Sequence, residues 1–217
     1  MTSISAVARL PTGPLLLASA SLTRRRLLES AGFEIEVCAA AIDEQAIRAS
    51  CAADGLPAGD TAIILAEMKG EAAHARNTPA LGQLLLAADQ ILEIDGDMLG
   101  KPAGHDAAAR QLARLQGRSH RLHTAAVILR DGRRIWHHLA VNDMQMRALS
   151  EDDIRIYLAG LGAAALWSPG SYQIESLGMH LFSRIGGCHY TILGLPLLEI
   201  TAFLREHGLH LTREDAT

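Results

Sequence analysis

The sequence predicts a mixed α/β protein in which helices flank a twisted, partly antiparallel sheet. Strand-like and helix-like segments alternate along the chain, but without the regular spacing that a doubly wound parallel sheet requires. Two pairs, Asp95-Gly96 and Asp131-Gly132, stand between apolar runs, where they are typical of β-hairpin turns. With 217 residues, 49% of them hydrophobic and 20% charged, the chain is long and apolar enough to bury a core.

The first half of the chain predicts two short strands and three helices. In chain order these are a buried strand at 15–18, a helix at 23–31, a strand at 33–37, and helices at 44–53 and 61–75. The second strand follows from the alternation of Phe33, Ile35 and Val37 with glutamates. Gly32 is a natural left-handed stop for the helix before it, and Asp60 is a suitable N-cap for the helix at 61–75.

The second half predicts most of the sheet. In chain order it contains strand runs at 84–88 and 91–94, a helix at 106–115, strands at 121–129 and 133–146, a helix at 150–159, a strand at 179–185 and a helix at 196–207. Asp89-Gln90 interrupts the first apolar run and is expected to end that strand. Ser150 and Asp153 have the spacing of a capping box, and Pro196 suits the first turn of the last helix.

Composition restricts the class of protein and its compartment. The 20 basic and 24 acidic residues give a net charge of −4, which argues against broad nucleic-acid binding. The three cysteines are an odd number without a CxxC pair, so we expect reduced thiols in a cytoplasmic protein. The apolar run at 15–18 is too short for a signal peptide, and no window is apolar enough to cross a membrane. A single domain over 1–217 is expected, with 1–13 and 208–217 as loose ends.

Several familiar functional motifs are either absent from the sequence or lie in the wrong structural context. Gly160-Leu161-Gly162 begins a match to the dinucleotide-binding pattern, but it follows a predicted helix instead of a strand. The chain contains neither a P-loop motif nor a G-x-S-x-G elbow. His120 and His123 lie three residues apart on a predicted strand, so they point to opposite faces and cannot chelate one metal. We therefore expect the histidines at the surface or at an interface.

Four segments carry polar side chains at positions suited to chemistry. Residues 19–26 place hydroxyls and arginines where a buried strand meets a helix, an arrangement that suits anionic oxygens or, alternatively, an N-cap with a solvated basic face. Lys69 lies inside a predicted helix and is otherwise an ordinary exposed lysine. Asp89 ends an apolar run, where an acid binds a cation, acts as a base or caps a turn. Lys101 precedes the rigid Pro102, outside any predicted helix.

Together these segments resemble the Maf-like nucleotide pyrophosphatases. The resemblance covers about residues 15–205 in the right order, so it also implies an inosine-triphosphatase-like fold with two closely packed lobes around a central cleft. The matching motifs are Leu17-Ala18-Ser19-Ala20-Ser21 followed by Arg24-Arg25, Asp43-Glu44, Leu65-Ala66 with Lys69, Ala88-Asp89-Gln90, Gly100-Lys101-Pro102, Leu115 with Gly117-Arg118 and His120, Tyr172 with Ile174-Glu175 and Gly178, and Gly194-Leu195-Pro196.

The resemblance implies an enzyme that hydrolyses a nucleoside triphosphate, with a modified or non-standard base, to the monophosphate and pyrophosphate. It implies a divalent cation (Mg²⁺, Mn²⁺ or Co²⁺) as cofactor, a nucleoside triphosphate as the partner rather than nucleic acid or a membrane, and a homodimer. The resemblance implies that Asp89 is the general base and that Glu44 and Asp89 are metal ligands. It implies that Arg24, Lys69 and Lys101 neutralise the phosphates and that Ser19 and Ser21 donate hydrogen bonds to them. It also implies that Gln90 and Glu175 recognise the base.

The base-reading positions favour the members that act on 7-methyl-GTP. Those members carry Asp-Gln and Glu, as this chain does at Asp89-Gln90 and Glu175, whereas the UTP- or dTTP-type members carry Asp-Thr and Gln. A carboxylate offers two acceptors, which suit the adjacent N1–H and N2–H donors of guanine. Thr23 departs from both groups, which carry Trp or Arg there, and Leu22 replaces the usual proline.

Two alternatives stay open at this stage. One is a pyrophosphatase that prefers UTP or dTTP. The other is a regulatory binding protein that restrains cell division, because some family members are associated with septum formation. Neither the acidic net charge nor any apolar helix in the sequence supports the regulatory alternative independently.

Overall fold

The centre of the molecule is a seven-stranded mixed sheet. The computed structural model describes residues 6–39 and 41–213. Strand β2 is parallel to β3 and β4, whereas β4, β5, β6, β7 and β8 pair antiparallel, so the predicted mixed α/β class is confirmed. The sheet order is β3 (Ile35–Val37), β2 (Leu15–Leu17), β4 (Leu84–Ile94), β6 (Ser119–Arg130), β7 (Arg133–Met146) and β8 (Phe182–Ile185), with β5 (Asp97–Leu99) paired to β4.

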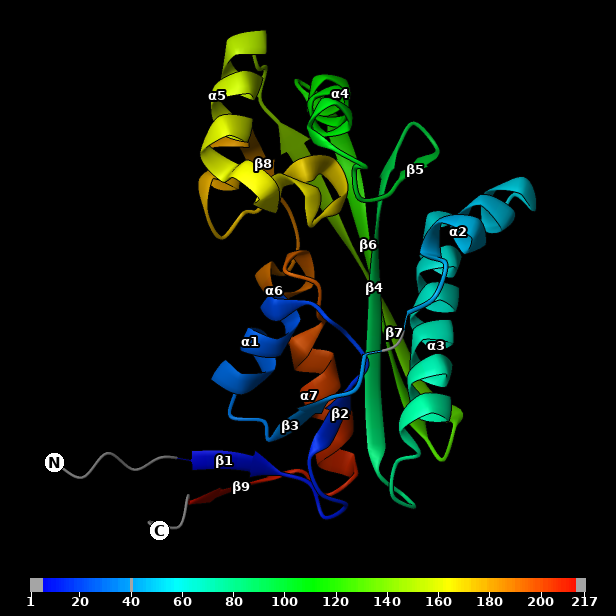
Figure 1. Ribbon diagram of the computed structural model, residues 1–217. Helices are drawn as coiled ribbons and strands as arrows, with labels where there is room; N and C mark the ends of the chain where they lie inside the picture. The colour runs from blue at the N-terminus through cyan, green and yellow to red at the C-terminus, as the bar shows by residue number, and fades with distance from the viewer. Residues whose placement is uncertain (1–5, 40, 214–217) are drawn as a thin grey trace, which may run out of the picture.

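Helices cover both faces of this sheet and one end of its long strands (Figure 1). The helices are α1 (Leu22–Ser30), α2 (Glu44–Ala53), α3 (Ala58–Asn77), α4 (His105–Leu115), α5 (Glu151–Leu161), α6 (His189–Ile192) and α7 (Leu197–Glu206), with 3₁₀ turns η1 (Gly162–Leu166), η2 (Pro169–Ser171) and η3 (Leu177–Leu181). Helix α3 packs along β4 and β6 on one face, and α1, α6 and α7 lie across the sheet from it. Within the described ranges, none of these helices combines the length and apolar character that crossing a bilayer requires.

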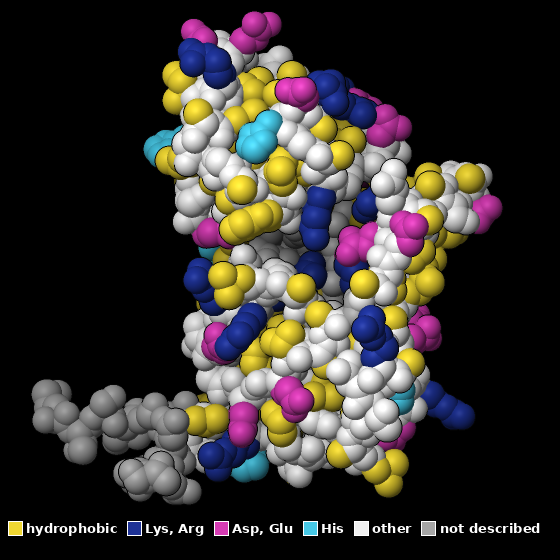
Figure 2. Space-filling model, in the orientation of Figure 1, with side chains coloured by type: hydrophobic (Ala, Val, Ile, Leu, Met, Phe, Trp, Pro, Cys, Tyr) yellow, Lys and Arg dark blue, Asp and Glu magenta, His cyan; other side chains and the backbone are white. Residues whose placement is uncertain are grey.

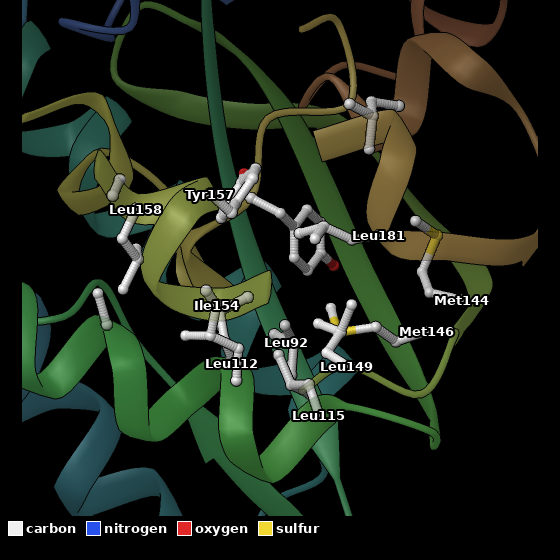
Figure 3. Packing of buried hydrophobic residues seen from close by; sticks show 14 of the residues in the cluster. Leu92, Leu112, Leu115, Met144, Met146, Leu149, Ile154, Tyr157, Leu158 and Leu181 are labelled. Atoms are coloured by element: carbon white, nitrogen blue, oxygen red, sulfur yellow. The ribbon is translucent and has the colours of Figure 1, made fainter. Parts of the chain in front are cut away.

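Strand β4 is buried on both faces, and its alternating side chains enter different clusters. Leu84, Leu86 and Ala88 pack with α1 and α7, whereas Leu85 and Ala87 pack against α3. The far end of the strand enters a third cluster with α4 and α5 (Figure 3). Because β4 runs through all three clusters, any polar side chain on it is held in a closely packed setting.

Helix α3 approaches the sheet closely because small residues line its contact face. A Cβ atom built on Gly70 would lie 2.7 Å from Cδ1 of Leu129 and 3.3 Å from Cβ of Ala87, so a larger residue would push the helix outward. Ala66 and Ala73 on the same face are fully buried. The close approach brings Lys69, the neighbour of Gly70, within reach of the sheet.

Three differences between the predicted and the observed boundaries exceed a shift of one or two residues or change the role of a residue. Residues 84–94 form one strand, so Asp89-Gln90 lies in its middle and not at its end, because Lys69 compensates the buried acid. Helix α3 begins at Ala58 with Pro57 as its N-cap, so Asp60 lies in the first turn and does not cap it. Residues 177–181 form a 3₁₀ turn before β8 instead of extending that strand.

The expected loose ends are wrong for part of each terminus. Strand β1 (Ala6–Arg9) pairs antiparallel with β9 (His210–Arg213), and the pair extends away from the body of the molecule in Figure 1. Backbone hydrogen bonds between segments about 200 residues apart form this pair, and the polar sequence of 208–217 does not reveal them. Residues 1–5 and 214–217 of these expected ends lie outside the described residues.

Two histidines expected at the surface or at an interface are buried within the chain instead. His120 is 3% exposed, its Nε2 lies 3.0 Å from Oη of Tyr172, and burial lowers the pKa of its ring to about 4. His123 is also buried, with Nε2 2.6 Å from Oε2 of Glu93. They belong to opposite faces of β6, as the strand periodicity predicts, since His120 packs near Tyr172 and His123 packs near Gly59 of α3.

Candidate active site

A cleft of about 820 Å³ brings the predicted site residues together. In Figure 2 it is visible as a hollow across the middle of the molecule, with Lys and Arg side chains in and around it. Its lining includes every site residue that the sequence predicts, namely Ser19, Ser21, Arg24, Glu44, Lys69, Asp89, Gln90, Lys101 and Glu175. Their common location is therefore a feature of the structure, whereas their individual roles stay predictions.

Asp89, Lys69 and Glu44 form a charged triad at the centre of the cleft. Asp89 is 4% exposed and projects toward α3, on the same face as Ala87. The Lys69 ammonium donates a hydrogen bond to Oδ1 of Asp89 and lies 2.9 Å from Oε1 of Glu44. Glu44 is placed at the start of α2, where Asp43 caps the helix by accepting from the backbone N–H of Ala46 at 2.9 Å. One ammonium therefore bridges two carboxylates from different elements.

The surrounding cations keep Glu44 ionised. Burial by itself raises the pKa of Glu44, but the attraction and hydrogen bond of Lys69, with smaller contributions from Lys101 and Arg48, outweigh burial and hold the pKa below its ordinary value. The carboxylate is consequently an anion at neutral pH, available to a cation.

Asp89 has one oxygen left for a ligand. Its Oδ2 atom is buried and has no hydrogen-bond partner in the described part of the chain. An unpartnered carboxylate oxygen beside ionised Glu44 fits a hard divalent cation, which commonly takes one or two protein carboxylates and completes its shell with water and phosphate oxygens. Residues 6–39 and 41–213 contain no cluster of three or more His, Cys, Asp or Glu side chains arranged to hold a metal. The divalent cation therefore stays a prediction, with Asp89 and Glu44 as the residues that would hold it.

Arg24 is an anchor as well as a charge. Its Nε donates to the carbonyl of Gly194 at 2.9 Å, and its Nη1 donates to the carbonyl of Ala88 at 2.8 Å. Burial lowers the pKa of the guanidinium, and the negative charges of Asp89 and Glu44 oppose that shift. Two of its donors therefore tie α1 to β4 and to the turn at 194, and its direct contact with phosphate stays a prediction.

Ser19 and Ser21 present hydroxyl groups whose oxygens already accept protein N–H groups. Ser21 is the N-cap of α1, and its Oγ accepts from the backbone N–H of Arg24 at 3.3 Å. The Oγ of Ser19 accepts from the backbone N–H of Ser21 at 3.2 Å. Since each oxygen is used as an acceptor, the hydroxyl protons can be donated to an anion. The N-terminus of α1 has no acidic residue in its first turn, so its partial positive charge makes this surface favourable for an anion.

The side-chain amide of Gln90 has a defined orientation. Its Nε2 donates to Oγ1 of Thr124 at 2.9 Å and lies 3.1 Å from the carbonyls of Thr191 and Ile192. The Thr124 hydroxyl gives its own proton to the Thr191 carbonyl at 2.9 Å, so it can only accept from Gln90. The amide nitrogen is therefore committed to the protein, and the amide oxygen is the group that Gln90 offers to a ligand.

Glu175 and Lys101 are exposed at the edge of the cleft. Among the described residues, Glu175 has neither an ion pair nor a side-chain hydrogen bond, so both of its oxygens can accept. The turn that carries it depends on Gly178, where a Cβ atom would lie 2.3 Å from the carbonyl oxygen of Gln173. That close approach lets the backbone N–H of Gly178 donate to the same carbonyl at 2.9 Å.

Among the charged and aromatic residues of the cleft lining, two escaped the sequence analysis. Arg48 lies over Gly100, because a Cβ atom built on Gly100 would be 2.6 Å from Nη2 of Arg48. Arg48 follows Glu44 by four residues on α2, and this spacing could have indicated that the two side chains share a face of the helix. Trp167 also lines the cleft and is 65% exposed. The sequence contains no motif around Trp167 that would have singled it out.

The fold and the cleft define a mixed-sheet α/β protein whose cleft is lined by cationic side chains around a buried carboxylate. A family model described as Maf-like protein matches residues 14–207. The chain belongs to the Maf-like protein family, and the family predicted from the sequence is confirmed.

Similar proteins cover nearly the whole chain. The chain is 48% identical to a nucleoside triphosphate pyrophosphatase of Nitrobacter hamburgensis (90% of this chain, 95% of that protein). It is 45% identical to a protein of the same name from Rhodospirillum rubrum (92% and 97%). It is 41% identical to a 7-methyl-GTP pyrophosphatase of Mesorhizobium japonicum (91% and 98%).

Solved structures resemble the chain more distantly. A HAM1 protein from Coxiella burnetii aligns with a TM-score of 0.40 and 16% identity over 61% of this chain and 72% of that chain. A nucleoside-triphosphatase (dITP/XTP pyrophosphatase) from Mycobacterium abscessus aligns with a TM-score of 0.35 and 17% identity over 63% and 75%. At these scores the likeness carries no argument about the site.

Proposed function

We propose that this protein is a hydrolase, a nucleoside triphosphate pyrophosphatase that releases the monophosphate and pyrophosphate. The observation that carries the proposal is the buried Asp89, with one oxygen unpartnered in the described part of the chain, in a cleft lined by cationic side chains. Relatives that are 41–48% identical over about nine-tenths of the chain carry pyrophosphatase names, which supports the same general reaction.

The chain's own residues account for phosphate binding. Ser19, Ser21 and the N-terminus of α1 would donate to phosphate oxygens, while Lys69 and Lys101 would neutralise the triphosphate. Charge builds up on the leaving pyrophosphate as the anhydride bond breaks, so fixed cations in a partly enclosed cleft stabilise the transition state more than the bound substrate.

Asp89 would act as the general base. A water molecule bound at Oδ2 would lose its proton to this carboxylate as the water oxygen bonds to phosphorus and the anhydride bond between the α and β phosphates breaks. Lys69 holds Oδ1 and so keeps the carboxylate oriented.

Glu44 and Asp89 would hold a divalent cation of the Mg²⁺, Mn²⁺ or Co²⁺ kind. When bound, such an ion would neutralise phosphate charge and lower the pKa of a coordinated water. The donor set supports this, because both groups are carboxylates and Glu44 is kept ionised.

The base-reading groups favour a guanine-type edge. Gln90 offers its amide oxygen and Glu175 offers two carboxylate oxygens, so the cleft presents acceptors where the base would lie. Guanine has adjacent N1–H and N2–H donors that match such acceptors, whereas uracil and thymine offer one donor flanked by acceptors. A guanine nucleotide, modified or not, is therefore the proposed substrate.

The test is pyrophosphate release from GTP, 7-methyl-GTP, ITP, UTP and dTTP with Mg²⁺, Mn²⁺ or Co²⁺. We expect the guanine nucleotides to be turned over fastest. Asp89→Asn should lower kcat by about 10²–10⁴-fold, the usual contribution of a general base. The matched control is Asp143→Asn, on an exposed acid of β7 that does not line the cleft. An Asp89→Asn variant within about tenfold of wild type would remove Asp89 from that role, and a wild type inactive on the whole panel would refute the proposed function.

A further inference from the structure

Trp167 presents an aromatic ring to the cleft instead of burying it. The side chain is 65% exposed, although aromatic residues make up only 4% of the chain. The chain has two tryptophans, and the other, Trp136, is half-buried and stacks on Phe203 with ring centroids 5.3 Å apart. A large exposed apolar ring at a cleft indicates a surface that a ligand covers.

The backbone around Trp167 is held firmly even though its ring is free. Ser168 donates its hydroxyl to the carbonyl of Tyr172 at 2.8 Å, and the backbone N–H of Gly170 donates to Oε1 of Gln111 on α4 at 2.9 Å. The side chain of Gln173 donates to the carbonyl of Ala164 at 2.9 Å, closing the segment on itself. These bonds fix the position from which the indole projects, and fixed positioning is what a binding platform requires.

The same segment leads directly to the base-reading Glu175. The acceptors of Gln90 and Glu175 would contact the edge of a base, so its flat face needs a separate partner. The described cleft lining contains two aromatic residues, Trp167 and Tyr172. The ring of Tyr172 is 5% exposed, packs edge-on against Phe182 with centroids 4.9 Å apart and bonds to His120 through its hydroxyl, so it is committed to the core.

We propose that Trp167 is the stacking platform for the nucleobase. This inference rests on the proposed function and adds a substrate-binding residue to it. The indole covers the flat face of the base while Gln90 and Glu175 bind its edge. Stacking on an aromatic ring tolerates any base, so Trp167 contributes affinity and leaves the choice of base to the acceptors.

The first experiment uses the fluorescence of the indole. In a Trp136→Phe background, which retains an aromatic partner for Phe203, Trp167 is the sole tryptophan. The protein is titrated with a guanosine triphosphate analogue whose α,β-bridging oxygen is replaced by methylene, and with inorganic tripolyphosphate as a base-free probe. We expect saturable quenching by the nucleotide and none by tripolyphosphate. Calorimetry on the same samples reports binding independently of the fluorescence.

The second experiment removes the ring. Trp167→Ala should weaken analogue binding and raise KM by about 5- to 100-fold with little change in kcat, whereas Trp167→Phe should retain most of the affinity. Tripolyphosphate should inhibit all three proteins equally. The matched control is Leu198→Ala, because Leu198 is 67% exposed and does not line the cleft.

The outcomes separate this inference from the proposed function. The inference is overturned if Trp167→Ala binds the analogue with unchanged affinity and the analogue does not quench the single-tryptophan protein. That result leaves the proposed pyrophosphatase function unaffected. Failure of the wild type to bind the analogue or hydrolyse any triphosphate overturns both. The inference is also overturned if Trp167→Ala changes the molecular mass measured by sedimentation but leaves KM unchanged. The ring would then be covered by a second copy of the chain.

Discussion

The anchoring role of Arg24 leads to a quantitative prediction. Its guanidinium bonds two backbone carbonyls, those of Gly194 and Ala88, at 2.9 and 2.8 Å. Hydrogen bonds that involve a charged group contribute about 1.5–3 kcal/mol each. Lysine keeps the charge, but it lacks the planar fork that reaches both carbonyls, so Arg24→Lys should lower the free energy of unfolding by about 1.5–3 kcal/mol. Arg24→Ala loses both carbonyl bonds, together with the long 3.4 Å contact from Nη1 to Oγ of Ser19, and should cost about 3–6 kcal/mol.

Urea unfolding followed by circular dichroism, together with steady-state kinetics, tests this prediction. The matched control is Arg48→Lys, since Arg48 lines the same cleft but has no side-chain hydrogen bond or ion pair within the described ranges. We expect that control to change the unfolding free energy by less than about 0.5 kcal/mol. If Arg24→Lys is as stable as wild type while its KM rises as much as that of Arg24→Ala, the arginine acts on the substrate and not as an anchor, and the reasoning is refuted.

Two further predictions concern the base-reading acid and a buried histidine. Glu175→Gln replaces one acceptor by a donor, so kcat/KM for GTP should fall by about 10-fold or more. The value of kcat/KM for UTP should be unchanged or higher. Equal losses of kcat/KM for both nucleotides would contradict recognition of the base by Glu175. The pKa of His120 is about 4 in the fold, below its unfolded value, so the stability it contributes is present above about pH 6.5 and lost as the pH falls toward 4. Between pH 7 and pH 5, the unfolding free energy of the wild type should therefore fall by about 2 kcal/mol more than that of His120→Gln. If urea unfolding shows the same pH dependence of stability in both proteins, protonation of His120 is not coupled to unfolding.

Much of the fold could be predicted because its determinants are local. The turns at Asp95-Gly96 and Asp131-Gly132 connect β4 to β5 and β6 to β7, as their dipeptides indicate. The capping box of Ser150 and Asp153 is present at the start of α5. Signals of this kind depend on residues only a few positions apart, so they can be read directly from the chain.

The errors occur where a distant partner changes the meaning of a residue. Asp89 was expected to end a strand because an acid inside an apolar run is costly, and Lys69, twenty residues away, removes that cost. His120 was expected at the surface or at an interface, yet Tyr172 supplies a buried partner 52 residues away. The pairing of β1 with β9 likewise depends on segments from opposite ends of the chain.

The sequence alone identified the family and the nine residues that the cleft brings together, because the motifs preserve residue types in order along the chain. Only the tertiary structure decided what each group can still offer to a ligand. It bound Arg24 to a carbonyl 170 residues away, committed the amide nitrogen of Gln90 to protein acceptors and left the ring of Trp167 uncovered. The physical reason is that a donor or acceptor is available to substrate only when no other part of the chain has used it, and such partners are set by packing across the sheet.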